Sequence, residues 1–188
     1  MKRKTLIVMV KEPRPGRVKT RLGRDIGMVG AAWWYRHQTT RLLRRLRDPR
    51  WDILLSVSPD GAVSTSHFWP ADLARAPQGA GDLGERMVRA LAFGTGPTLL
   101  IGSDIPGVGR GHIAQGFAML NAAPSVIGPA TDGGFWLVGL ARPHGMPEGL
   151  FQNVRWSHPE TLHDALPTLP GPVAYADRLQ DVDTAADL

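Results

Sequence analysis

The chain of 188 residues contains no cysteine. This absence excludes disulfide bonds, zinc sites built from thiolates and catalysis by a thiol nucleophile. No apolar run approaches the roughly 20 residues that span a bilayer, so we expect neither a transmembrane helix nor a membrane partner. The apolar stretch near the N-terminus is only Leu6–Val10. Because it is too short for a signal peptide, we interpret it as a first strand and expect a cytoplasmic protein.

Two nucleotide-binding signatures are absent from the loop after the first strand, Lys11–Leu22. This loop has neither Gly-x-x-x-x-Gly-Lys-Ser/Thr nor Gly-x-Gly-x-x-Gly, which argues against a P-loop kinase or ATPase and against a dinucleotide fingerprint after that strand. The histidines lack the spacing of a metal site, and no Ser–His–Asp arrangement can be read from their order. We expect most of them to be ordinary surface or helix-end residues: His37, His67, His112, His144, His158 and His163.

Lysine is scarce and arginine is abundant, with 4 lysines, 18 arginines and a net charge of +5. Many of the arginines lie in Arg36–Arg50, where Trp34, Leu42, Leu43 and Leu46 recur at helical spacing. We therefore interpret these arginines as the solvated face of a helix. The alternative is a non-catalytic basic module that binds nucleic acid, which no recognisable nucleic-acid-binding motif supports.

Strand and helix signals alternate along the chain. Apolar runs predict strands at Thr5–Val10, Ile53–Val57, Thr98–Ile101, Ser125–Gly128, Phe135–Leu140 and Val173–Ala176. Periodicity and capping signals predict helices at Met28–Arg47, Gly84–Phe93 and Gly111–Asn121, a short helix that begins at Ser157 and a terminal turn at Thr184–Asp187. This alternation predicts an α/β fold with a mostly parallel sheet and helices on both faces, in a single domain of residues 1–188. The pair Gly133–Gly134 indicates a local departure from parallel order.

The segment Thr98–Pro106, TLLIGSDIP, places a carboxylate directly after a strand. The strand Thr98–Ile101 has the pattern of a central strand that is buried on both faces. Asp104 then lies at the rim where open α/β sheets bind ligands, and its oxygens suit Mg²⁺ or Mn²⁺. The alternative is an Asx-turn in which Asp104 only caps the backbone ahead of Pro106.

The loop after the first strand, KEPRPGRVKTRL, is rich in cations. Gly16 provides a flexible turn, Lys19 and Arg21 provide positive charge, and Thr20 provides a hydroxyl. Such a loop at the carboxyl end of a strand is typical of polyphosphate binding. A solvated basic loop without a ligand is the alternative.

A second carboxylate lies in the turn GPATDGGFWLVG. Asp132 precedes two glycines that permit a tight turn into the next strand. A plain hairpin turn would explain this segment alone. If the strands before Asp104 and Asp132 lie side by side, however, both carboxylates line one cleft, which favours a metal or acceptor site.

Two further segments carry polar groups. In QGAGDLGERM, Gln78 is placed to contact a nucleobase, Asp82 to cap a helix and Arg86 to pair with a phosphate. A capped helix after a flexible loop explains the same residues equally well. Near the C-terminus, Asp181 and Asp183 could cap a turn, or one of them could supply a second metal ligand.

The segments KEPRPGRVKTRL, QGAGDLGERM, GSDIPG, GPATDGGFWLVGL and DVDTAADL follow one another in this order from Lys11 to Leu188. Together they resemble the rSAM/selenodomain-associated transferase 1 family, which comprises short bacterial GT-A-like glycosyltransferases of the arsenosugar-biosynthesis type. That family belongs to the nucleotide-diphospho-sugar transferase superfamily. The resemblance implies a three-layer α/β/α Rossmann-like GT-A fold and the use of a nucleotide or nucleotide-sugar with Mg²⁺ or Mn²⁺.

The resemblance also implies roles by position. The residues that would hold phosphates are Gly16, Lys19 and Arg21, and those that would lie near the base or ribose are Gln78, Gly84 and Arg86. Asp104 would be the metal-binding acid, Asp132 would face the sugar or acceptor, and Asp183 would be a second metal ligand. The first loop lacks the Gly-rich stretch of the wider nucleotidyltransferases, which leaves the bound nucleotide open.

The leading hypothesis is a metal-dependent transferase that moves the glycosyl group of a nucleotide-sugar to a small acceptor, with catalysis by Asp104, Lys19 and Asp132. Asp132 would act as the base on the acceptor hydroxyl. The alternative enzyme is a nucleotidyltransferase that joins a nucleoside triphosphate to a phosphorylated small molecule and releases diphosphate. In that reaction Asp132 would only position the acceptor or the metal. We expect no nucleic-acid partner, and the sequence leaves the oligomeric state, base, sugar and acceptor open.

Overall fold

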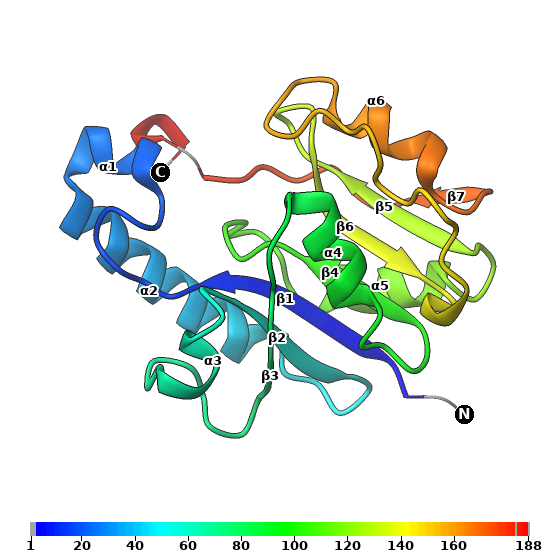
Figure 1. Ribbon diagram of the computed structural model, residues 1–188, viewed down its shortest axis with the longest axis horizontal. Helices are drawn as coiled ribbons and strands as arrows, with labels where there is room; N and C mark the ends of the chain where they lie inside the picture. The colour runs from blue at the N-terminus through cyan, green and yellow to red at the C-terminus, as the bar shows by residue number, and fades with distance from the viewer. Residues whose placement is uncertain (1–2, 183, 188) are drawn as a thin grey trace.

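The computed structural model describes residues 3–182 and 184–187, and its centre is a mixed sheet of strands in the order β3-β2-β1-β4-β6-β5-β7 (Figure 1). Strand β6 is antiparallel to β4 and β5, and the other neighbouring strands are parallel. The strands are β1 (Thr5–Lys11), β2 (Asp52–Ser58), β3 (Ala74–Pro77), β4 (Thr98–Ile101), β5 (Ser125–Pro129), β6 (Phe135–Leu140) and β7 (Val173–Tyr175).

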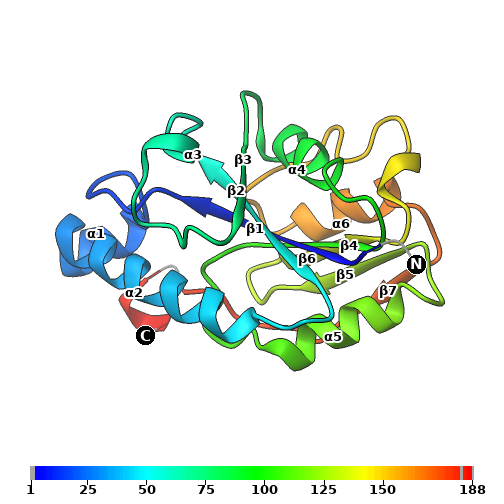
Figure 2. The same ribbon diagram turned by 90° about the horizontal axis from the view of Figure 1, so that it is seen from below.

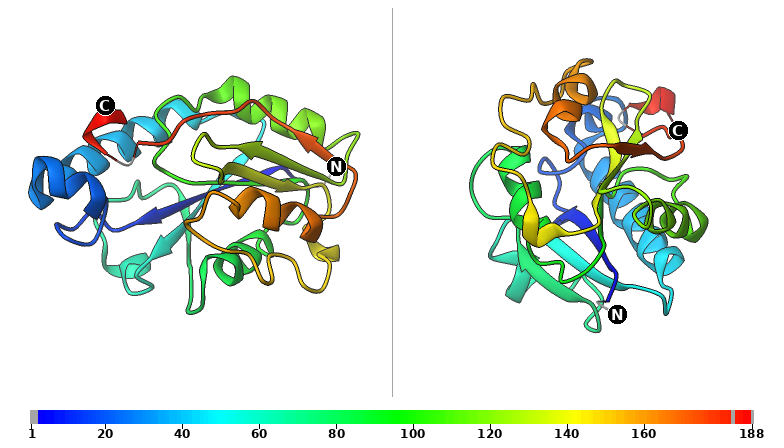
Figure 3. Two further views of the ribbon diagram at one scale, coloured as in Figure 1. Left: turned by 90° about the horizontal axis from the view of Figure 1, so that it is seen from above. Right: turned by 90° about the vertical axis from the view of Figure 1, so that its right-hand side faces the viewer.

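Helices cover both faces of the sheet (Figures 2 and 3). Helices α2 and α5 pack on one face, and α4 and α6 pack on the other. The helices are α1 (Thr20–Ile26), α2 (Met28–Leu46), α3 (Ala62–Thr65), α4 (Leu83–Leu91), α5 (Arg110–Met119) and α6 (Thr161–Ala165), with 3₁₀ turns η1 (Pro143–Gly145), η2 (Leu166–Thr168) and η3 (Ala185–Asp187). The predicted three-layer α/β/α fold with a mostly parallel sheet and local antiparallel pairing is confirmed. No helix in the described part of the chain combines the length and the apolar character needed to cross a bilayer.

Strand β1 is buried on both faces, and its alternate side chains serve two cores. Leu6 and Val8 pack on the side of α2 and α5, whereas Ile7 packs on the side of α4. Because side chains alternate along a strand, a strand buried on both faces is almost continuously apolar. This pattern made β1 and β4 recognisable from the sequence.

Several elements depart from the predicted pattern. The short helix expected from Ser157 begins only at Thr161, because Ser157 has a left-handed φ of 55° and cannot continue into a helix. Helix α1 begins at Thr20, inside the cationic segment Lys11–Leu22, where no helix was expected. Strand β3 was also not expected, since its sequence Ala-Arg-Ala-Pro lacks the apolar character of a strand and pairs only at the edge of the sheet.

The arginines of α2 and the residues after it are exposed, as predicted, and several of them make contacts within the chain. The Arg36 guanidinium lies 5.2 Å from the centre of the Phe68 ring, and Arg45 donates a hydrogen bond of 2.7 Å to the carbonyl oxygen of Pro106. Arg47 pairs with the carboxylate of Asp72. These contacts tie α2 to neighbouring loops and give part of the arginine cluster a structural explanation.

After β7 the chain runs back along the carboxyl edge of the sheet toward α1, as the red segment of Figure 1 shows. The N–H group of Leu179 donates to the carbonyl oxygen of Pro129, and that of Val182 donates to the carbonyl oxygen of Asp104. This segment therefore lies beside the loops that follow β4 and β5.

Gly139 lies in β6 between two neighbouring strands that leave no room for a side chain. A Cβ atom there would lie 2.3 Å from Leu99 Cδ2 and 2.8 Å from Val126 Cγ1. We expect Gly139→Ala to lower the free energy of unfolding by about 1–3 kcal/mol, because a well-packed core resists an added methyl group. Chemical denaturation measures this change.

The matched control is Gly111→Ala in α5, where a Cβ atom would meet no described atom within 4 Å. Alanine at that helical position should leave the stability unchanged or raise it by up to about 1 kcal/mol. A Gly139→Ala protein as stable as wild type would contradict the tight packing of Gly139 between Leu99 of β4 and Val126 of β5.

Candidate functional site

A cavity of about 910 Å³ opens at the carboxyl ends of β1 and β4. The chain leaves β1 toward β2 on one side of the sheet, whereas β4 lies on the other side of β1. Such a reversal of strand order leaves a crevice at the carboxyl edge, which is where open α/β sheets bind ligands. The volume lies in the range of small-molecule sites.

An ion pair joins the loops that follow these two strands. Lys19 Nζ lies 2.8 Å from Asp104 Oδ2, although the two residues are 85 positions apart in the sequence. The Lys19 side chain is only 7% exposed, whereas the Asp104 side chain is 36% exposed. Both residues line the cavity. The ammonium group is therefore held within the wall, while the carboxylate keeps access to the cavity.

Lys19 owes its position to its backbone. It immediately precedes α1 and has a left-handed conformation, with φ 46° and ψ 48°. A non-glycine residue in this region is uncommon and occurs preferentially at functional sites. Thr20 and Arg21, which begin α1, also line the cavity. Gly16 has a φ of +73° and permits the turn in the loop, but it is not among the described residues that line the cavity.

Tyr35 on α2 holds the ends of β1 and β4 together beneath this ion pair. The N–H group of Lys11 donates to Tyr35 Oη at 3.0 Å, and Tyr35 Oη lies 2.8 Å from Ser103 Oγ. Burial raises the pKa of the Tyr35 phenol. The helical period of α2 places Tyr35 on the buried face with Ala31, but nothing in the sequence indicates the partners of its hydroxyl group.

Of the residues predicted to lie near the base or ribose, Gln78 and Arg86 line the cavity. The Gln78 amide donates to the carbonyl oxygens of Val10 and Ser56, at 3.2 and 2.9 Å, and so joins the ends of β1 and β2. Arg86 Nε donates to the carbonyl oxygen of Gly81 at 2.9 Å.

Helix α4 begins next to these residues. Asp82 is confirmed as its cap, because its side chain accepts a hydrogen bond from the N–H group of Glu85 in a reciprocal capping box. Gly84 is buried and is not among the described residues that line the cavity. A Cβ atom on Gly84 would lie 2.9 Å from Phe151 and from Trp156. Its visible role is therefore close packing of α4 against the loop after β6.

Asp132 also lines the cavity, and in strand order it lies on the other side of Asp104 from Lys19. In the sheet, β6 lies next to β4 on the side away from β1, and Asp132 belongs to the turn that enters β6. Its Oδ1 accepts a hydrogen bond of 2.9 Å from the N–H group of Gly134. Asp181 also lines the cavity, whereas Asp183 lies outside the described residues.

The carboxylates around the cavity do not form a complete cage for a metal ion. Among the described residues, no group of three or more histidine, cysteine, aspartate or glutamate side chains could hold one. Mg²⁺ commonly binds through one or two carboxylates together with phosphate oxygens of a substrate. Asp104, which keeps access to the cavity, suits such a shared site.

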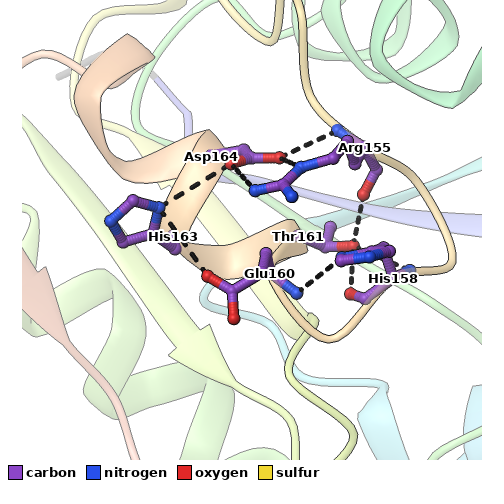
Figure 4. Close-up of polar contacts among 6 residues, drawn as sticks. All are labelled: Arg155, His158, Glu160, Thr161, His163 and Asp164. Atoms are coloured by element: carbon purple, nitrogen blue, oxygen red, sulfur yellow. Dashed lines mark hydrogen bonds and ion pairs between the residues drawn. The ribbon is translucent and has the colours of Figure 1, made fainter.

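A polar turn between Arg155 and Thr161 (Figure 4), which the sequence indicated only as the start of a helix, forms another part of the cavity wall. Arg155 binds Asp164 through two contacts of 2.7 and 2.8 Å, and the guanidinium holds the pKa of the Asp164 carboxyl well below its usual range. Ser157 and His158 in this turn line the cavity. His158 was expected to be an ordinary surface residue, because its isolated position in the sequence carries no motif.

We expect Tyr35→Phe to lower the free energy of unfolding by about 1–3 kcal/mol at pH 7, because it removes this hydrogen-bond partner from the part-buried Lys11 N–H group and from the buried Ser103 hydroxyl. The unfolded chain ionises its tyrosines near pH 10, below the raised pKa of Tyr35 in the folded state. The stability contribution of Tyr35 is therefore constant below about pH 10 and is lost as the pH rises through the folded-state pKa. Tyr35→Phe should therefore show a smaller decrease in the free energy of unfolding above pH 10 than wild type. Denaturation curves between pH 7 and 11 measure this decrease.

The control is Tyr175→Phe in β7, since Tyr175 is exposed. It should leave the stability at pH 7 unchanged. Equal stability of Tyr35→Phe and Tyr175→Phe would show that the Tyr35 hydroxyl does not support the site.

Comparison with known families and proteins supports the fold. Residues 42–158 match the family described as "Uncharacterized protein conserved in bacteria (DUF2064)". A comparison with curated protein sequences gave no significant match.

Among solved structures, a protein from Desulfovibrio desulfuricans G20, provisionally named a nucleotide-diphospho-sugar transferase, is 30% identical, with a TM-score of 0.85 over 98% of this chain and 84% of that chain. Two others share the fold alone. The 4-diphosphocytidyl-2C-methyl-D-erythritol synthase from Anaerococcus prevotii DSM 20548 is 9% identical, with a TM-score of 0.63 over 99% of this chain and 94% of that chain. Rv0371c from Mycobacterium tuberculosis H37Rv, in a complex with manganese, is 15% identical, with a TM-score of 0.58 over 99% of this chain and 95% of that chain.

The family match covers more than half of the chain. The protein therefore belongs to the bacterial DUF2064 family.

Proposed function

We propose that this protein is a metal-dependent transferase that uses a nucleotide-sugar and moves its glycosyl group to a small acceptor, with the chain acting as a single domain. The observation that carries the proposal is the meeting of Lys19 and Asp104 at 2.8 Å in the crevice where the strand order reverses. A cation and a metal-binding carboxylate at this position suit the two sides of a diphosphate group.

In this proposal the loop after β1 binds the diphosphate. Lys19 and Arg21 supply fixed positive charge, Thr20 supplies a further hydrogen-bond donor, and Gly16 permits the turn of the loop that carries them. Charges that are already in place stabilise the negative charge that develops on a leaving nucleoside diphosphate. Gln78 and Arg86 lie toward the base or ribose, and Gly84 permits the close packing of α4, which carries Arg86, against Phe151 and Trp156.

Asp104 would hold Mg²⁺ or Mn²⁺, with Asp183 as a second ligand. When bound, the ion would neutralise charge on the phosphate oxygens. Asp132 would accept the proton of the acceptor hydroxyl in an inverting transfer. The manganese complex of the distantly related Rv0371c supports the choice of cation, and the name given to the protein from D. desulfuricans supports the choice of a nucleotide-sugar. The resemblance to rSAM/selenodomain-associated transferases supports the same reaction class.

The first test is nucleotide binding by calorimetry with UDP, GDP and CDP, each with and without Mn²⁺. We expect one of them to bind in a metal-dependent manner, and Asp104→Asn to weaken that binding at least tenfold, about 1.4 kcal/mol. Asp52→Asn is the control, because Asp52 is an exposed partner of Arg3 at the start of β2, far from the crevice. The proposal fails if no nucleotide shows metal-dependent heat, or if both variants bind like wild type.

The small number of metal ligands around Asp104 leads to a second expectation, which concerns the affinity for Mn²⁺. Because the described residues form no complete metal cage, Mn²⁺ alone should bind weakly, and its affinity should rise at least tenfold when the nucleotide is present. Titration of Mn²⁺ followed by electron paramagnetic resonance measures the free ion in both cases. Tight binding of Mn²⁺ without nucleotide would show that the metal site is preformed, contrary to the proposal.

Nucleotidyl transfer to a phosphorylated acceptor is the competing reaction, because it uses the same cations and carboxylate and because the synthase from A. prevotii shares this fold. The released products distinguish the two. Glycosyl transfer releases a nucleoside diphosphate, whereas nucleotidyl transfer releases inorganic diphosphate. Mass spectrometry of reactions with a panel of nucleotide-sugars and nucleoside triphosphates should show the first product and not the second.

A further inference from the structure

Left-handed backbone conformations mark two walls of the cavity. Among the described residues, those with positive φ that are not glycine are Lys19, Phe151, Asn153 and Ser157. Three of them lie close together in the loop after η1. Ser157 and Lys19 both line the cavity. Such conformations cost free energy and persist where the surrounding structure requires them.

Hydrogen bonds hold the turn at Ser157 in this shape. The Thr161 hydroxyl lies 2.6 Å from the carbonyl oxygen of Arg155 and 2.7 Å from that of His158, and it accepts a bond of 3.2 Å from the His158 N–H group. Arg155 is fixed in turn by its two contacts with Asp164 (Figure 4). The turn is therefore a rigid part of the wall.

The same turn is packed directly onto the turn that carries Asp132. A Cβ atom on Gly133 would lie 2.1 Å from the carbonyl oxygen of Pro159, so only glycine fits there. The Leu162 N–H group donates to the carbonyl oxygen of Gly133 at 2.9 Å. Asp132 and His158 thus belong to two turns in direct contact, and both line the cavity.

The hydrogen bonding of His158 decides what its ring can offer. His158 Nδ1 accepts a hydrogen bond of 3.1 Å from the N–H group of Glu160. A neutral imidazole that accepts at Nδ1 carries its own proton on Nε2. His158 is thereby prepared as a hydrogen-bond donor, while the Asp132 carboxylate is an acceptor. A neighbouring donor and acceptor match the hydroxyl groups of a ligand.

The distribution of charge favours an uncharged ligand at this end of the cavity. Lys19 follows β1, Asp104 follows β4, and Asp132 precedes β6, so Asp104 lies between the cation and the second carboxylate in strand order. Arg155, the cation of the turn, is bound to Asp164, and Arg86, the cation that α4 contributes to the cavity, donates to the carbonyl oxygen of Gly81. A phosphorylated acceptor would bring its negative charge close to Asp132, which is unfavourable.

We propose that Asp132 and His158 bind hydroxyl groups of an uncharged, polyol-like acceptor, and that His158 is a specificity-determining residue for it. This inference rests on the proposed glycosyl transfer and names the acceptor class that the same cavity takes. His158 binds and orients the acceptor by donating from Nε2. Its effect falls on the acceptor and leaves the nucleotide unaffected.

The test uses pairs of acceptors that differ only by a phosphate group: glycerol with glycerol 3-phosphate, and glucose with glucose 6-phosphate. Wild-type protein, Mn²⁺ and the nucleotide-sugar whose nucleotide binds best are incubated with each acceptor, and products are quantified by mass spectrometry. We expect the uncharged member of at least one pair to react at least tenfold faster than its phosphate. Faster or equal use of the phosphates, or no product from any of the four by protein that binds the nucleotide, overturns the inference.

Substitutions at His158 separate binding of the acceptor from support of the turn. In His158→Asn the side-chain oxygen can still accept the Glu160 N–H bond, but the outward donor is lost. In His158→Gln an amide donor reaches the position of Nε2. We expect His158→Asn to raise the KM for the uncharged acceptor at least tenfold with an unchanged melting temperature, and His158→Gln to restore the KM to within a few-fold of wild type.

The matched control is His163→Ala, because His163 is exposed on α6 and is not among the described residues that line the cavity. It should change neither the KM for the acceptor nor the nucleotide affinity. An unchanged KM in His158→Asn contradicts the role of His158 even if the nucleotide binds as proposed. If the wild-type protein does not bind a nucleotide, by contrast, the proposed function itself is overturned. The two failures are therefore distinguishable.

Discussion

The ion pair between Lys19 and Asp104 is the contact on which the site depends. It joins the loops after β1 and β4, and the separation of 2.8 Å fixes one relative position for them. The lysine is nearly buried, and a buried charge is tolerated only with a partner. Asp104 therefore has a structural task in the free protein. A diphosphate with its metal ion would take over both charges, which links occupancy of the cavity to the arrangement of these loops.

The remaining contacts place other groups around this pair. Tyr35 joins the two strand ends from the side of α2, and Gln78 joins β1 to β2 through backbone carbonyl oxygens. The turn at His158 is packed onto the turn at Asp132. The result is a cavity with Lys19 and Arg21 after β1, and with the Asp132 carboxylate and the His158 hydrogen-bond donor at the turns beside β6. This separation of charge matches a donor substrate that is anionic and an acceptor that is not.

Much of the fold was predictable, because β1 and β4 are apolar on both faces and the helices between them are periodic. Asp104 could be named as a candidate because it lies just after β4, and Lys19 because it belongs to the cation-rich loop after β1. The left-handed backbone of Lys19, which sets its direction, has no sequence signal. Tyr35 and His158 could not be found, since their roles come from partners far away in the chain or from a turn whose φ angles are atypical. Ser157 misled the prediction of α6 because it resembles a helix cap in sequence and adopts a left-handed conformation in space.

The most direct measurement of the central claim is a double-mutant cycle on the affinity for the nucleotide in the presence of Mn²⁺, with Lys19→Met, Asp104→Asn and the double variant. If both side chains act on one diphosphate, each single variant weakens binding at least tenfold. The double variant then loses less than the product of the two effects, with a coupling of about 0.5–3 kcal/mol. Independent, multiplicative losses, or an affinity that neither substitution changes, would contradict a shared diphosphate site.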